Sequence, residues 1–277
     1  MAFVSAVRTY FAIRPASFSN AVRLFTAYAT SALLRIAFPS RFGAVGHVVR
    51  GTRNLRVWID GVQFEVRPRT NDLDLLSRKH EPLTTDWFRI SPGDVVVDVG
   101  AHIGRYALRA AAKGAKVVAI EPDPENFRLL RRNVQLNGLS NVDLLAQAMT
   151  ASPTTLLLSV GPAVNTGTSS VRIDDGRSLD NSRPVRMLRV PGETLDGLVR
   201  SRRLGRIDWL KIDVEGHEIP VLEGGRSALD IARRLILEVT DSTRVPCQRI
   251  AESHGFRLAT VEEGHPASNL LFAKPDA

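Results

Sequence analysis

The chain has 277 residues, of which 44% are hydrophobic and 24% charged, and this balance excludes disordered, collagenous and coiled-coil proteins. Its single cysteine, Cys247, excludes an internal disulfide and a cysteine-rich metal site, and favours a cytoplasmic location. The formal net charge of +8 would suit an acidic partner. However, the arginines form short runs without interleaved aromatic residues, which indicates a solvated surface.

The N-terminal segment contains an apolar stretch that is too short to cross a membrane. Only residues 24–34 lie between Arg23 and Arg35, well below the roughly 20 residues that a bilayer requires. The spacing predicts an amphipathic helix with an apolar stripe of Val22, Phe25, Ala29, Leu33 and Ile36. The stripe packs either on its own domain or a dimer partner, or it lies on a membrane surface. In the latter case residues 21–38 would make a peripheral membrane contact.

Residues 55–66 alternate between apolar and polar side chains on either side of Asp60-Gly61, which predicts a β-hairpin with a type I′ turn. This turn sets six apolar side chains in facing pairs on one face, namely Ile59 with Val62, Val57 with Phe64 and Leu55 with Val66. The pattern changes near Ser91. We therefore divide the chain into an N-terminal helical and hairpin appendage, residues 1–90, and a main domain, residues 91–277.

The main domain alternates short apolar strands with helical stretches, which is typical of βαβ units around a parallel sheet. The predicted strands are residues 95–99, 116–120, 142–146, 209–212, 235–239, 257–261 and 270–273. Between the second and third strands, a helix is capped by Asp123, begins at Pro124 and ends at Asn137-Gly138. Several turn signals in residues 152–193 predict a long insertion without regular structure.

The strongest chemical signal is Asp98-Val-Gly-Ala-His-Ile-Gly104, in which an apolar strand ends in an acid and continues through a glycine turn into a helix. Gly100 and Gly104 would let the backbone approach a ligand at the carboxyl edge of the sheet. Nicotinamide binding is disfavoured because His102 stands where a dinucleotide fold requires glycine. Glu121, at the end of the next strand, can accept hydrogen bonds from both ribose hydroxyls of an adenosine.

These residues, with Glu121-Pro-Asp-Pro-Glu-Asn-Phe127 and Asn137-Gly138, resemble class I S-adenosylmethionine-dependent methyltransferases. The stretch Leu210-Lys-Ile-Asp-Val-Glu-Gly-His-Glu218 narrows the resemblance to the FkbM family, over about residues 81 to 272. The resemblance implies a Rossmann-like α/β fold with a seven-stranded, mostly parallel sheet and an antiparallel last strand. It also implies S-adenosyl-L-methionine as the methyl donor and a hydroxyl oxygen as the usual acceptor.

The same resemblance assigns cofactor-binding roles residue by residue. The methionine part of the cofactor would contact Asp98, Gly100 and Gly104, the ribose Glu121, and the adenine Gln147 and Ala148. Gln147 is a departure, because many class I enzymes have an acid at that edge. Some related enzymes bind magnesium through acids at two adjacent strand ends, here Asp213 and Glu238. Two carboxylates are few ligands for magnesium, so we expect no metal and an activity that survives EDTA.

A hydroxyl acceptor must also lose a proton during methylation. One loop at the end of a central strand carries three candidate catalytic residues, Asp213, Glu215 and His217, and Glu218 follows them. His217 has an ordinary pKa near neutrality, which suits a general base, although it can equally be a plain loop residue. Glu215 can instead belong to a turn that caps the next helix. His102 is more typical of a packing or backbone-bonding residue than of a base.

We therefore expect a cytoplasmic O-methyltransferase that acts on a hydroxyl of a sugar, glycolipid or secondary metabolite. An RNA methyltransferase is one alternative, but amino-directed enzymes of that kind commonly carry an Asn/Asp-Pro-Pro-aromatic motif where this chain has Asp213-Val-Glu-Gly216. A non-catalytic cofactor-binding protein or membrane-surface adaptor is the other alternative. The intact Asp98, Gly100, Glu121 and Asp213 argue against it.

Overall fold

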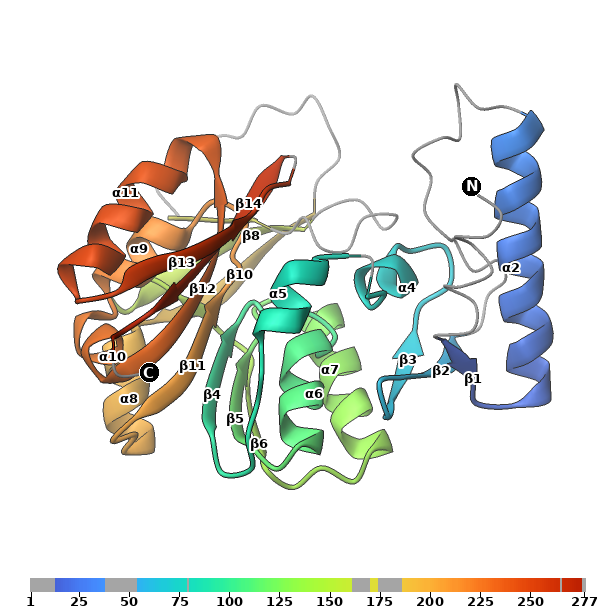
Figure 1. Cartoon of the computed structure of the whole chain (residues 1–277), viewed down its shortest axis with the longest axis horizontal. Helices are drawn as coiled ribbons and strands as arrows, with labels where there is room; N and C mark the ends of the chain where they lie inside the picture. The colour runs from blue at the N-terminus through green and yellow to red at the C-terminus, as the bar shows by residue number, and fades with distance from the viewer. Residues whose placement is uncertain are drawn as a thin grey trace.

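The computed structural model describes residues 13–37, 54–78, 80–160, 170–173, 186–264 and 266–275. Its centre is a seven-stranded sheet with the strand order β13-β14-β12-β11-β4-β5-β6 (Figure 1). These strands are β4 (Val95–Val99), β5 (Lys116–Ile120), β6 (Val142–Leu145), β11 (Ile207–Ile212), β12 (Ala232–Thr240), β13 (Arg257–Glu262) and β14 (Ala267–Ala273). Only β14 runs antiparallel to its neighbours, and the predicted Rossmann-like fold is therefore confirmed.

Helices cover both faces of this sheet (Figure 1). On one face lie α6 (Arg105–Ala112) and α7 (Pro124–Leu136); on the other lie α8 (Leu195–Arg202), α9 (Glu218–Glu223), α10 (Arg226–Ile231) and α11 (Asp241–Ser253). Adjacent strand residues bury their side chains on opposite faces, since Val96 packs in the cluster of Leu130 and Val97 in that of Leu198. Both faces are thus covered, and the carboxyl ends of the strands lie at one edge of the sheet.

The predicted hairpin forms with the predicted register. Strand β2 (Leu55–Ile59) pairs with β3 (Val62–Val66), and all six apolar side chains are buried. Asp60 and Gly61 have φ angles of 52° and 80°, which agree with a type I′ turn. A short strand, β1 (Arg14–Pro15), pairs with the free edge of β2.

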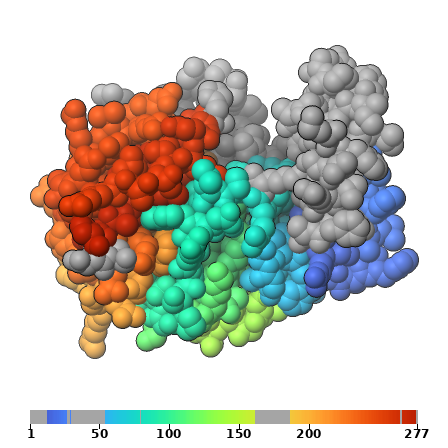
Figure 2. Space-filling model, in the orientation of Figure 1, coloured from blue at the N-terminus to red at the C-terminus, as the bar shows by residue number. Residues whose placement is uncertain are grey.

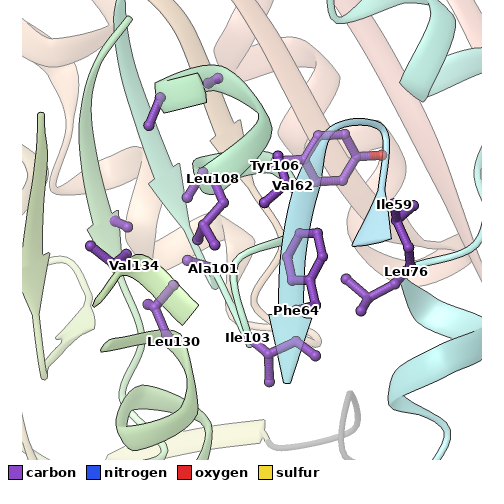
Figure 3. Close-up of a cluster of buried hydrophobic side chains, with 14 of the residues drawn as sticks. Ile59, Val62, Phe64, Leu76, Ala101, Ile103, Tyr106, Leu108, Leu130 and Val134 are labelled. Carbon is purple, nitrogen blue, oxygen red and sulfur yellow. The ribbon is translucent and has the colours of Figure 1, made fainter. Parts of the chain in front are cut away.

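This hairpin belongs to the core of the main domain. Figure 3 shows Phe64 beside Ile103, near the start of α6. The Asn133 side chain, on α7, accepts the Glu65 N–H at 2.7 Å and donates to the Ile103 carbonyl at 3.0 Å. The space-filling view shows the light-blue hairpin lying directly against the green region of α6 and α7 (Figure 2). The hairpin was predicted to belong to an appendage of residues 1–90. It instead shares one hydrophobic core with α6 and α7 of the main domain.

The prediction of an unstructured insertion at residues 152–193 is wrong. Strands β8 (Thr154–Val160), β9 (Ser170–Ile173) and β10 (Arg186–Glu193) join β7 (Ala148–Met149) in a four-stranded sheet. Leu156, Leu158 and Val190 form its small core. Three consecutive leucines conceal the alternation of β8, and the surrounding turn signals are also typical of a loop. Those signals, Gly161-Pro162, Asn165-Thr-Gly167 and Asp174-Asp-Gly176, lie outside the described residues.

The N-terminal helix α2 (Phe18–Ala37) is present, but part of its predicted apolar stripe is exposed. This exposure argues against packing of the stripe on its own domain, and a dimer partner or a membrane surface stays a prediction. Leu24 is fully buried, whereas Val22 and Phe25 are 48% and 61% exposed. The side chains of Leu33 and Ile36 lie outside the described residues. Among the helices of the described segments, none is long and apolar enough to cross a membrane.

Candidate active site

A cleft of about 550 Å³ opens at the carboxyl edge of the seven-stranded sheet. Seven of the nine predicted site residues line it: Asp98, Gly100, Glu121, Gln147, Ala148, Asp213 and Glu215. The other two, Gly104 and His217, are not part of its lining. The cleft therefore brings the expected cofactor residues and the acidic loop after β11 into one cavity.

Asp98 lies at the end of β4 and is 1% exposed. Its Oδ2 accepts the Ala107 N–H at 3.0 Å, whereas its Oδ1 has no hydrogen-bond partner among the described residues. Burial raises the pKa of Asp98 to about 6, although the Lys211 ammonium opposes that shift. A buried carboxylate oxygen that lines a cleft and has no partner suits a cationic ligand such as an ammonium or sulfonium group. The residues at this end of the cleft thus fit S-adenosylmethionine.

The two glycines of the turn also serve the fold, and their predicted role beside a ligand stays a prediction. A Cβ on Gly100 would lie 1.8 Å from the Asp213 carbonyl oxygen, so Gly100 lets β4 approach the end of β11. A Cβ on Gly104 would lie 2.1 Å from Leu108 and 2.8 Å from Leu130, so this glycine lets α6 pack closely. Their φ angles of 83° and 101° also favour glycine.

Glu121 connects the glycine turn to the end of β5. Its two carboxylate oxygens accept the N–H groups of His102 at 2.8 Å and Asp123 at 2.9 Å. Burial raises the pKa of Glu121 to about 7. The Asn126 side chain also hydrogen-bonds this carboxylate. A carboxylate has about four lone-pair sites, so it can still accept a bond from a ribose hydroxyl. Burial also lowers the pKa of His102 to about 4, so its ring is neutral and it fits the packing role better than that of a base.

Three carboxylates from distant parts of the chain also meet in this cleft. Glu81, Asp213 and Glu238 each place a carboxylate oxygen within 4.8 Å of the others. Glu81 precedes α5 (Pro82–Trp87) and is held by Arg105 at 2.6 Å and by the Tyr106 hydroxyl at 2.7 Å. Glu81 was not predicted as a site residue, because neither its spacing nor its neighbours connect it with Asp213.

Lys211, a buried cation within this cluster, was not predicted from sequence. Its side chain is 2% exposed, and its Nζ lies 2.7 Å from Asp213 Oδ2. Burial alone would raise the pKa of Asp213, but the Lys211 ammonium lowers it to about 2. The ionised Asp213, together with burial, holds the pKa of Glu238 well above its usual range. The two neighbouring carboxyls therefore differ in acidity, and Asp213 is the stronger acid.

The candidate bases differ in their access to the cleft. Glu215 is exposed at the cleft lining. The surrounding protein and the carboxylates of Asp213 and Glu218 raise the pKa of Glu215 to about 8, while water at this exposed position screens part of that effect. His217 is 7% exposed, its Nε2 lies 3.1 Å from Thr150 Oγ1, and burial lowers its pKa. This geometry favours Glu215 over His217 as a base that can reach an acceptor.

Comparison with known proteins agrees with this arrangement. The methyltransferase FkbM domain matches residues 98–264 of this chain. Methyltransferase 1 of Beauveria bassiana is 28% identical over 59% of this chain and 72% of its own length. The hexuronic acid methyltransferase AglP of Haloferax volcanii is 31% identical over 53% of this chain and 56% of its own length.

Among solved structures, magnesium protoporphyrin IX methyltransferase from Synechocystis with bound SAM is similar to this chain. It is 15% identical, with a TM-score of 0.44, over 71% of this chain and 79% of its own.

Proposed function

Because the chain belongs to the FkbM methyltransferase family and uses S-adenosylmethionine, we propose that it methylates a hydroxyl oxygen of a sugar, glycolipid or secondary metabolite. One observation carries this proposal: the unpartnered Asp98 carboxylate oxygen and the Glu81–Asp213–Glu238 cluster line the same cleft. Asp98 suits the cationic donor, and the carboxylate cluster suits an acceptor that donates hydrogen bonds.

The bound cofactor supplies a methyl carbon that is activated by a positively charged sulfur. The protein then has two tasks, to hold the acceptor oxygen in line with that carbon and to receive the acceptor's proton. Asp213 is fixed by Lys211 and is a weak base because its pKa is low, so we assign it the orientation of the acceptor hydroxyl. Glu215 lines the same cleft and has a raised pKa, so we propose that it accepts the proton of the acceptor hydroxyl.

The proposal is tested by incubating the enzyme with cell extract and isotopically labelled S-adenosylmethionine and identifying the labelled products by mass spectrometry. We expect a labelled methyl ether, and a rate lower by roughly 10²-fold in Asp213→Asn, which retains the shape but not the charge. Cofactor affinity should change little in this variant. Cofactor binding without turnover on any hydroxyl compound would instead favour a non-catalytic binding protein.

A further inference from the structure

The acceptor end of the cleft has a lining that accepts hydrogen bonds. We call this lining the acceptor wall, and it consists of Glu81, Asp213, Glu215, Glu238 and Asn269. Its members come from separate elements, since Glu81 precedes α5, Glu238 lies in β12 and Asn269 lies in β14. Glu238 and Asn269 face each other in the register of the two strands. The fold thus gathers oxygen-bearing side chains from the N- and C-terminal parts of the chain.

An unsatisfied oxygen lies beside the three carboxylates. Asn269 is 4% exposed, and its Nδ2 donates to Glu81 Oε1 at 3.2 Å. Its Oδ1 has no hydrogen-bond partner among the described residues. Because a buried amide oxygen is costly to leave unpaired, a group that donates a hydrogen bond would complete this wall.

Acidic side chains outnumber basic ones along the cleft. Of the described residues that line it, eight are acids: Glu81, Asp98, Glu121, Asp213, Glu215, Glu238, Glu262 and Glu263. The described lining has two permanent cations, Lys211 and Arg105, and each is already engaged by an acid. His80 and His102 also line the cleft, and burial lowers the pKa of both, so both are neutral.

The acids of the wall also lie close to one another. Glu81, Asp213 and Glu238 each place a carboxylate oxygen within 4.8 Å of the others. The Asp213 charge and burial accordingly raise the pKa of Glu238. A carboxylate or phosphate on the acceptor would add a further negative charge beside these side chains, with no cation of the described lining free to bind it.

We propose that the acceptor is an uncharged polyol or an amino sugar, which donates hydrogen bonds to the acceptor wall and carries no carboxylate or phosphate near the reacting hydroxyl. This inference rests on the proposed O-methylation and specifies its substrate class. It separates this chain from an enzyme for hexuronic acids, the acceptor named for the Haloferax relative. It also disfavours nucleic acid, whose phosphates would approach the same acids.

The electrostatic basis can be tested without knowing the acceptor. Three soluble nitroxides that differ in charge, TEMPOL, 4-amino-TEMPO and 4-carboxy-TEMPO, are added to isotope-labelled enzyme saturated with S-adenosylhomocysteine. Paramagnetic relaxation of the amide signals of Glu215, Gly216 and Asn269 then reports the local concentration of each probe. At pH 8, close to the pKa of Glu215, we expect the cationic probe to exceed the anionic probe by roughly threefold or more, and salt to reduce the difference.

A matched variant and a distant site serve as controls. In Glu215→Gln the difference between the cationic and anionic probes should shrink at Gly216 and Asn269, because one acid of the wall is gone. Gly138 lies in a turn outside the cleft lining, so the difference between the probes at Gly138 should be the same in Glu215→Gln and in the wild type. Equal enrichment of the two probes at the wall, or enrichment of the anionic probe, would overturn the inference.

A second assay separates failure of this inference from failure of the proposed function. Methyl glucoside, methyl glucuronide and glucosamine are compared as methyl acceptors with labelled S-adenosylmethionine. Methylation of the glucuronide in preference to the other two would overturn the inference while supporting methyl transfer to oxygen. If none of the three is methylated although the cationic nitroxide is enriched, the preference of the wall for uncharged or cationic groups is supported. The O-methylation proposal then loses support.

Discussion

At the scale of single residues, the general base is the assignment most open to a direct test. If Glu215 accepts the proton, the rate should rise with pH as its carboxyl ionises. The rate should reach half its maximum at pH 8 or somewhat below, because water screens part of the pKa shift, and should level off at higher pH. This rise should disappear in Glu215→Gln. His217→Ala should retain it, because His217 is buried against Thr150 outside the cleft lining. If the rate instead rises through an ionisation near neutral pH, and only His217→Ala loses that rise, His217 would be the general base.

Glu121 should contribute to cofactor affinity both directly and through the turn it holds. In Glu121→Ala we expect the Kd for S-adenosylhomocysteine to rise at least roughly tenfold, since each hydrogen bond to a charged group contributes about 1.5 to 3 kcal/mol. The variant also releases the N–H groups of His102 and Asp123. Titration calorimetry on wild type and variant measures the effect, and equal affinities would refute the ribose assignment.

Lys211 bears on the question of a metal. Glu81 adds a third carboxylate to the two expected from sequence, but the Lys211 ammonium already lies 2.7 Å from Asp213. We therefore keep the expectation that excess EDTA leaves methyl transfer intact. A loss of activity that magnesium specifically restores would contradict it and would identify Glu81, Asp213 and Glu238 as ligands.

At the scale of elements, the hairpin and α7 were predictable because their signals are local. Asp60-Gly61 determines a turn, and Asp123 caps α7 by accepting the N–H groups of Glu125 and Asn126. The sheet formed by β8, β9 and β10 was not predictable, because its pairing joins strands across a long connection. The burial of Leu24 in α2 was not predictable for a similar reason, since it depends on contact with the hairpin.

Two glycines with positive φ angles test the contact between β4 and β11. Gly100→Ala should destabilise the fold by several kcal/mol, because its Cβ would meet the Asp213 carbonyl at 1.8 Å, and cofactor binding should be lost as well. Gly61→Ala, where no atom lies within 4 Å, should cost only about 1 to 2 kcal/mol of strain. Urea unfolding measures both, and equal losses would show that crowding at Gly100 is unimportant.

Helix α2 offers a second matched pair. Leu24→Ala removes a fully buried side chain and should lower the free energy of unfolding by about 2 to 5 kcal/mol. Phe25→Ser, at a position that is 61% exposed, should change it by less than about 0.5 kcal/mol. A large loss in Phe25→Ser would mean that Phe25 is covered in solution. Sedimentation with anionic vesicles would then show whether a membrane surface or protein covers it.

At the scale of the whole molecule, the strand-end residues of the site were predictable, whereas Glu81 and Asn269 were not. Asp98, Glu121 and Asp213 end neighbouring strands, and parallel strands bring their carboxyl ends to one edge. Glu81 enters the cleft because the segment before α5 packs on α6 through Arg105 and Tyr106. No local pattern encodes such a long-range contact, so this part of the acceptor wall is visible only in the folded chain.

We propose that this cleft transfers a methyl group from S-adenosylmethionine to a hydroxyl oxygen. The most direct test supplies the cofactor with a carbon-13 methyl group and locates that carbon in the purified product by NMR. We expect an O-methyl signal in the product, and we expect its formation to depend on Asp213. A labelled methyl group on nitrogen or carbon, or full product formation by Asp213→Asn, would contradict it.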